Sequence, residues 1–172
     1  MWIEFEEDDE IFIITADGVD CSINEPRQIP STSWYSQKFN GPGLTCELGI
    51  AINHNKLVWI HGPERSGNGN DLAIFTRPNG LKSKIPVEKK VVTDRMHKDP
   101  VCAIQNAQDT DEVKTFKQRA RARHEIFNGH LKKFKVIGSK FRHAVKKHKE
   151  CFEAVCVIAQ HQLENGHPLF DV

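Results

Sequence analysis

KTFKQRARARHEIFNGHLKKFK, residues 114–135, has the spacing of an amphipathic helix and places a single acid inside a strongly basic segment. At three- and four-residue steps the apolar side chains form one stripe, which comprises Phe116, Ala120, Phe127, Leu131 and Phe134. Gln118, Arg121, Glu125 and Lys132 share roughly the opposite face. Two cations flank Glu125 there, which suits a metal-binding carboxylate beside a phosphodiester. A solvated helix with an Arg121–Glu125 ion pair worth about 0.3 kcal/mol is the alternative.

The charge of the chain is divided between its two ends. The formal net charge is only +1, but residues 1–20 contain eight acids and no Lys or Arg, whereas residues 114–149 contain thirteen Lys or Arg and one acid. Such a basic region is compatible with nucleic acid, and also with a solvated basic helix face. The length of 172 residues predicts one domain with a core of its own.

Five cysteines show no CxxC spacing and leave one unpaired, so a reducing compartment fits them best. Zinc binding by Cys151, Cys156, His143 and His148 is disfavoured, because the five-residue step within each pair puts its side chains on different sides of a helix. No apolar run approaches the roughly 18 residues of a membrane span, and the acidic start of the chain is unlike a signal peptide. We therefore expect an intracellular protein outside the membrane.

The first strand is expected at residues 11–16, IFIITA, whose β-branched and apolar composition is typical of a strand buried on both faces. Asp17 and Gly18 follow it. An Asp at the end of a buried strand, next to a Gly that allows a phosphate to approach, can serve as a metal ligand. Asp-Gly between two apolar runs is also a strong hairpin signal, and Asp17 can lie at the strand tip in either case.

Residues 24–43 are rich in Pro, Ser, Asn and Gly and predict a loop. Its aromatic and basic side chains either stack on nucleic-acid bases or pack on the domain itself; they are Trp34, Tyr35, Lys38 and Phe39. Residues 45–52 alternate in polarity as a half-buried strand does, and residues 56–60 are its expected antiparallel partner. Three strands therefore precede the first helix.

Two further acids stand at the boundaries of expected elements. Asp71 begins a short helix that Pro78 terminates, and it is either the N-cap of that helix or a metal ligand. Asp94 follows a fourth strand at residues 87–93. Sites assemble at the carboxyl ends of strands in open α/β sheets, although a solvated turn is the alternative for Asp94.

Residues 96–112 have no clear period and predict an irregular connection. A second amphipathic helix is expected over residues 139–165, about 40 Å long at 1.5 Å per residue. The predicted fold class is α/β, a mixed sheet of three antiparallel strands and one parallel strand, flanked by helices and ending in a long C-terminal helix. This order, with acids at two strand ends and one on a helix, resembles a ribonuclease-H-like nuclease core.

Four short motifs follow one another along the chain. They are ADG at residues 16–18, GNGND at 67–71, VVTDR at 91–95 and RARHEIFNGHLKKF at 121–134. Together they resemble the DDE superfamily endonuclease domain of PIF/Harbinger-type transposases. Within the last motif, Arg121, Glu125 and Lys132 fit the Arg-x3-Glu-x6-Lys part of the transposase signature.

The chain also departs from the family pattern. Gln118 stands where the signature has Tyr, and His97 is part of an Arg-Met-His sequence where the family has a small residue or Gly and then Tyr after the acid. The family's Glu-x2-Phe-Gly has its Phe one place early here, at Phe127. These departures leave a catalytically silent relative that binds DNA or a protein as the alternative to an active nuclease.

The resemblance implies that Asp17, Asp94 and Glu125 form the catalytic set, and that these acids and Asp71 bind divalent cations. Mg²⁺ or Mn²⁺ is implied, as two ions about 3.5–4 Å apart that activate a water or a 3′-hydroxyl. DNA is the implied partner. Its scissile or flanking phosphates would be contacted by Arg121 and Lys132.

The implied function is a DNA endonuclease and strand transferase that cuts phosphodiester bonds at transposon ends in the nucleus. Residues 11–165 would form the DDE domain, between an acidic extension at 1–10 and a tail at 166–172. No helix-turn-helix region of the kind these transposases carry precedes the domain, so a separate DNA-recognition protein is an expected partner.

Overall fold

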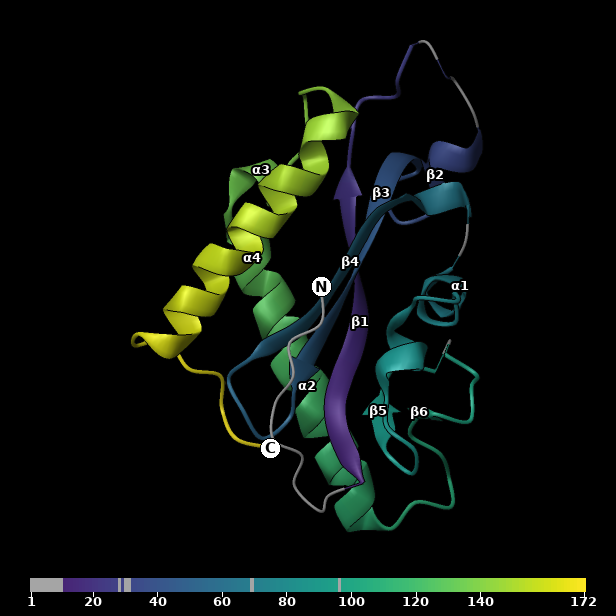
Figure 1. Ribbon diagram of the computed structural model, residues 1–172, viewed down its shortest axis with the longest axis vertical. Helices are drawn as coiled ribbons and strands as arrows, with labels where there is room; N and C mark the ends of the chain where they lie inside the picture. The colour runs from purple at the N-terminus through teal and green to yellow at the C-terminus, as the bar shows by residue number, and fades with distance from the viewer. Residues whose placement is uncertain (1–10, 28, 30–31, 69, 96) are drawn as a thin grey trace.

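β1, Phe12–Ser22, lies inside a six-stranded mixed sheet and pairs with strands of both directions. On one side it runs antiparallel to β3, Gly41–Ala51, and on the other it runs parallel to β5, Lys90–Val92. β3 also pairs antiparallel with β4, Leu57–Arg65, and with β2, Tyr35–Ser36. β6, Cys102–Ala103, runs parallel to β5 at the far edge (Figure 1).

The computed structural model describes residues 11–27, 29, 32–68, 70–95 and 97–172. Within these ranges the expected α/β class is confirmed, because a mixed, mostly antiparallel sheet is flanked by helices and followed by a C-terminal helix. The acidic extension predicted at residues 1–10 lies outside the described residues. The five cysteines carry free thiols.

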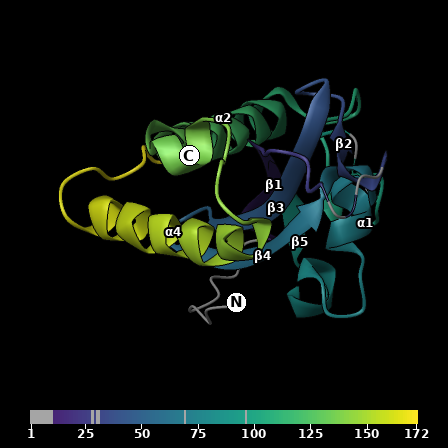
Figure 2. The same cartoon turned by 90° about the horizontal axis from the view of Figure 1, so that it is seen from above.

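Helices cover both faces of the sheet (Figure 2). α2, Asp111–Lys133, and α4, His148–Glu164, pack with β1, β3 and β4 around the largest buried apolar cluster, and α3, Lys135–Gly138, adds Ile137 to it. α1, Asp71–Phe75, and the 3-10 helix Leu81–Lys84 cover the other face through Phe75 and Leu81. None of the helices in the described ranges is long and apolar enough to cross a membrane.

The first strand is longer than its sequence suggested. β1 does not end at Ala16 but continues through Asp17 and Gly18 to Ser22, and both residues pair with β3, opposite Leu48 and Glu47. The Asp-Gly hairpin interpretation is therefore wrong. Val19 and Cys21 are buried on the α2 face, so the period of two that defines a strand continues past the glycine.

The C-terminal helix is shorter than predicted. α4 begins at His148 rather than at residue 139, and a 3-10 turn, Val145–Lys147, precedes it. Phe141 explains the difference. Its backbone forms a parallel bridge with Ile23, and its side chain packs with Ile23 and Trp34 in a separate apolar cluster. A residue whose backbone is bridged to a strand cannot also continue a helix.

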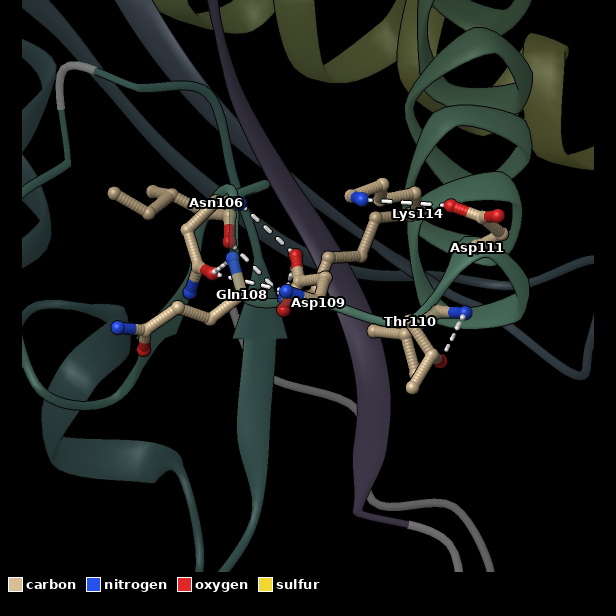
Figure 3. A network of polar contacts seen from close by, with 9 residues as sticks. Asn106, Gln108, Asp109, Thr110, Asp111 and Lys114 are labelled. Atoms are coloured by element: carbon tan, nitrogen blue, oxygen red, sulfur yellow. Dashed lines mark hydrogen bonds and ion pairs between the residues drawn. The ribbon is translucent and has the colours of Figure 1, made fainter.

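The start of α2 is fixed by a set of short-range polar contacts (Figure 3). Thr110 caps the helix by accepting a hydrogen bond from the Val113 backbone N–H at 3.3 Å. Asn106 Oδ1 accepts from the backbone N–H groups of Gln108 and Asp109. The Asp109 carboxylate then pairs with Lys117 Nζ at 3.0 Å, in the second turn of the helix. These contacts set the rotation of α2, and thereby the direction of its later side chains.

Arg123 holds the middle of α2 against the β3–β4 turn and the C-terminal segment. Its guanidinium is buried and donates to the backbone carbonyls of Ala51 at 2.7 Å and His54 at 2.8 Å, to Asn55 Oδ1, and to the Phe170 carbonyl. Only the planar five-donor fork of arginine can reach these four acceptors together.

Arg123→Lys should therefore lower the free energy of unfolding by about 2–4 kcal/mol, because a lysine leaves several buried carbonyls unpaired. Urea unfolding followed by circular dichroism measures the change. Arg142→Lys, at an exposed position between α3 and α4, is the matched control and should change the stability by less than about 0.5 kcal/mol. Equal losses in the two variants would contradict the anchoring role of Arg123.

Candidate active site

Asp17 and Asp94 lie side by side because of the register between two parallel strands. Thr15 of β1 pairs with Val92 of β5, and each acid stands two residues beyond its member of this pair. Neighbouring strands are about 4.8 Å apart, and residues separated by two point to the same face. The sheet thus carries both carboxylates to one level.

Glu125 reaches the same place from α2. A pocket of about 110 Å³ is lined by Asp17, Asp94 and Glu125 together with part of their surroundings, which are Thr15, Ala16, Val92, Arg121 and His124. At about 30 Å³ per water molecule in the liquid, the pocket has room for a few small ions or waters. The three acids that the sequence named as a catalytic set are therefore brought together, from two strands and one helix.

The pocket is electrostatically unfavourable for Asp17. The pKa of Asp17 is raised to about 6. Burial is the largest cause; the Gly18 backbone N–H acts against it, and the negative charges of Asp71 and Asp94 act with it. A carboxylate that is buried among other carboxylates is relieved by a bound cation.

Two polar side chains hold these acids in place, and neither was singled out from the sequence as a site residue. Asn128 Nδ2 donates to Asp17 Oδ2 at 2.9 Å, and His97 Nδ1 lies 2.8 Å from Asp94 Oδ1. Both side chains are buried. Asn128 could have been found, because it follows Glu125 by three residues and so shares its side of the helix; His97 lies in a loop whose path the sequence does not reveal.

His124 packs under the pocket as a neutral side chain. Its Nδ1 lies 2.7 Å from the Thr15 hydroxyl, and burial lowers its pKa to about 3. The imidazole therefore adds no positive charge beside Asp17 and Glu125 at neutral pH. It ties α2 to β1 one residue before Glu125, which fixes where that acid enters the pocket.

Asp71 approaches from the other face of the sheet. A β-carbon at position 18 would come within 2.5 Å of Asp71 Oδ1, so the carboxylate lies directly over Gly18, whereas Asp17 points toward α2. Burial raises the pKa of Asp71, and the charge of Asp20 adds to the shift. The N-cap alternative for Asp71 is wrong, because Asn70 caps α1 by accepting from the Ala73 N–H. Asp71 thus lies across the sheet from the three-acid pocket and does not line it.

The two cations predicted to bind phosphate occupy different places. Arg121 lines the pocket itself. Lys132 is exposed about three turns further along α2 than Arg121, where its charge acts against the burial that raises the pKa of Cys21 to about 12. Lys132 therefore lies toward the C-terminal half of β1, away from the acids.

The side chains that line the pocket are suitable ligands for divalent metal ions, but their carboxylates are too far apart to share one. Carboxylate oxygens are the ligands that Mg²⁺ and Mn²⁺ prefer, and three of the residues that line the pocket are acids. Within the described ranges, no three His, Cys, Asp or Glu side chains are close enough together to hold a metal ion. The carboxylates would have to turn toward one another on binding.

Comparisons with protein-family models, with curated proteins and with solved structures find no match to this chain. The family resemblance therefore depends on the sequence motifs, and the function has to be argued from the geometry of the site.

Asp17→Asn should stabilise the metal-free protein at neutral pH. The folded-state pKa of Asp17 is about 6, above its unfolded value, so the wild type loses stability as the pH rises from about 4 through 6. An amide carries no such penalty and can still accept the hydrogen bond from Asn128. The expected gain is up to about 3 kcal/mol above pH 7, disappearing below about pH 4.

Urea unfolding across this pH range, in a chelating buffer, measures the difference. Glu153→Gln, on the exposed side of α4, is the matched control and should show no comparable gain. A stability difference between Asp17→Asn and wild type that does not vary with pH would contradict the buried, charged state of Asp17.

Proposed function

We propose that this protein is a divalent-metal-dependent DNA endonuclease and strand transferase of the DDE type, resembling the catalytic domain of PIF/Harbinger-type transposases. The observation that carries the proposal is the meeting of Asp17, Asp94 and Glu125 in one pocket. Asp17 and Asp94 are 77 residues apart in sequence, and Asp94 and Glu125 are 31 residues apart. A set of separate solvated acids would have no reason to converge.

The topology supports the proposal independently of the motifs. β1, β3 and β4 are antiparallel, β5 is parallel to β1, and α2 follows the last strand. This arrangement is compatible with the ribonuclease-H-like core expected from the sequence. The acids occupy β1, the segment after β5 and the following helix, in the order that such a nuclease requires.

Asp17, Asp94 and Glu125 would hold the cations, with Asp71 close enough to add its field to that of Asp17. Bound metal would supply an activated water or 3′-hydroxyl and neutralise charge on the leaving oxygen. Asn128 and His97 orient the carboxylates of Asp17 and Asp94 through their hydrogen bonds. Arg121, on the wall of the pocket, is placed to bind a non-bridging oxygen of the scissile phosphate.

Purified protein should nick supercoiled DNA when Mg²⁺ or Mn²⁺ is added, and Glu125→Gln should abolish the reaction because it removes one of the three acids. Agarose gel electrophoresis of the plasmid measures it. Glu112→Gln, at an exposed position on the same helix, is the control and should nick at the wild-type rate. If wild type binds DNA but neither it nor Glu112→Gln nicks, the silent DNA-binding alternative replaces the nuclease.

His97 offers a test of how Asp94 is oriented. His97→Leu should reduce nicking by about tenfold or more, whereas His97→Asn, which keeps an N–H donor near the position of Nδ1, should recover much of the rate. The rate as a function of Mn²⁺ concentration measures both variants. A purely structural role would make the two variants equally defective and would leave their apparent affinity for Mn²⁺ unchanged.

A further inference from the structure

A run of exposed basic side chains follows the middle of α2 along the chain. Between Glu125 and Glu150 the sequence contains no acid. Seven exposed basic side chains of this stretch, here called the basic arc, are Lys132, Lys133, Lys135, Lys140, Arg142, Lys146 and Lys147. In the part of the chain that the structure describes, none of the seven forms an ion pair within 4.0 Å. Their charge is therefore available to a partner.

The basic arc is fixed in position by backbone contacts to β1. Phe141 donates its N–H to the Ser22 carbonyl at 2.8 Å and accepts from the Asn24 N–H at 3.3 Å. Its side chain is buried in the cluster with Ile23 and Trp34. Lys140 and Arg142 flank this anchored residue and are exposed, so their positions relative to β1 are set by the fold.

The same contacts set the distance between the basic arc and the acidic pocket. Asp17 and Ser22 belong to one strand and are five residues apart, which is about 17 Å at roughly 3.3 Å per residue. Lys132 lies between them, near Cys21. In B-DNA a base pair rises about 3.4 Å, so 17 Å along a duplex corresponds to about five base pairs.

We infer that the basic arc binds the phosphate backbone of the DNA duplex that flanks the cleavage site, about five base pairs from the scissile phosphate. This inference rests on the proposed function for its choice of DNA over other polyanions. Arg121 would contact the phosphate at the pocket, and the arc from Lys132 to Lys147 would contact those that follow. These contacts to phosphates are independent of the DNA sequence, and they position the duplex along β1.

The inference is tested with Lys140→Gln/Lys146→Gln in the full chain. Fluorescence anisotropy without divalent metal measures affinity for a labelled duplex of about three helical turns. The double variant should bind at least about tenfold more weakly, and the slope of log affinity against log salt between about 50 and 200 mM should fall by about 2, one for each lost phosphate contact. Lys56→Gln/Lys84→Gln, also at exposed positions, has the same charge change and should keep the wild-type affinity and slope.

Equal losses in the two double variants would show that only net charge matters and would overturn the inference, as would wild-type affinity in the Lys140/Lys146 variant. Thermal unfolding of all variants should be unchanged, since every substituted side chain is exposed. Binding is measured without cleavage, so the arc can be confirmed even if nicking fails. Failure of both the binding and the nicking would instead reject DNA as the partner.

The position along the duplex has its own test once the nicked bond has been mapped. Uncharged methylphosphonate linkages placed about four to six base pairs from that bond should weaken wild-type binding. They should have little further effect on Lys140→Gln/Lys146→Gln, because the partner cations are already absent. Additive losses would place the arc elsewhere on the DNA and overturn the geometry proposed for it.

Discussion

The packing of α2 against β1 is the constraint on which the rest of the molecule depends. Arg123 fixes the helix to the β3–β4 turn, His124 ties it to Thr15, and Phe127 and Leu131 bury it in the main core. Because these contacts occur on successive turns, they fix the rotation of α2 about its own axis relative to the sheet. Glu125 is consequently presented at the level of Asp17, and the basic residues that follow it are carried along β1.

Asp17 lowers the stability of the fold in the position that the proposed metal binding requires. Asp17 is half-buried in the middle of a central strand, where an ionised carboxylate is unfavourable, and other acids increase the penalty. The fold keeps it there with a hydrogen bond from Asn128, while His97 does the same for Asp94. Both of these residues lie where the chain departs from the Harbinger pattern. The departures therefore do not leave the acids unsupported, because each one supplies a polar partner to an acid.

The sequence was sufficient for features that depend on local periodicity. The amphipathic pattern of residues 114–135 corresponds to most of α2, and the alternation at 45–52 and the apolar run at 56–60 correspond to β3 and β4. The wrong predictions, for the end of the first strand and the start of the C-terminal helix, arose where a local sequence pattern fits two structures. The Asp-Gly pair suggested the end of a strand because it resembles a turn, and Phe141 fitted a helical spacing although its backbone is bridged to β1.

The sequence by itself determined which side chains are available: the acids, the basic run after Glu125 and the faces of the helices and strands on which they stand. Only the tertiary structure decided which of them meet. The parallel register of Thr15 with Val92 puts Asp17 beside Asp94, and the antiparallel register of Gly18 with Glu47 keeps β1 continuous, so that Asp71 lies over the opposite face. Strand register depends on pairing between residues far apart in the chain, which local sequence patterns do not encode.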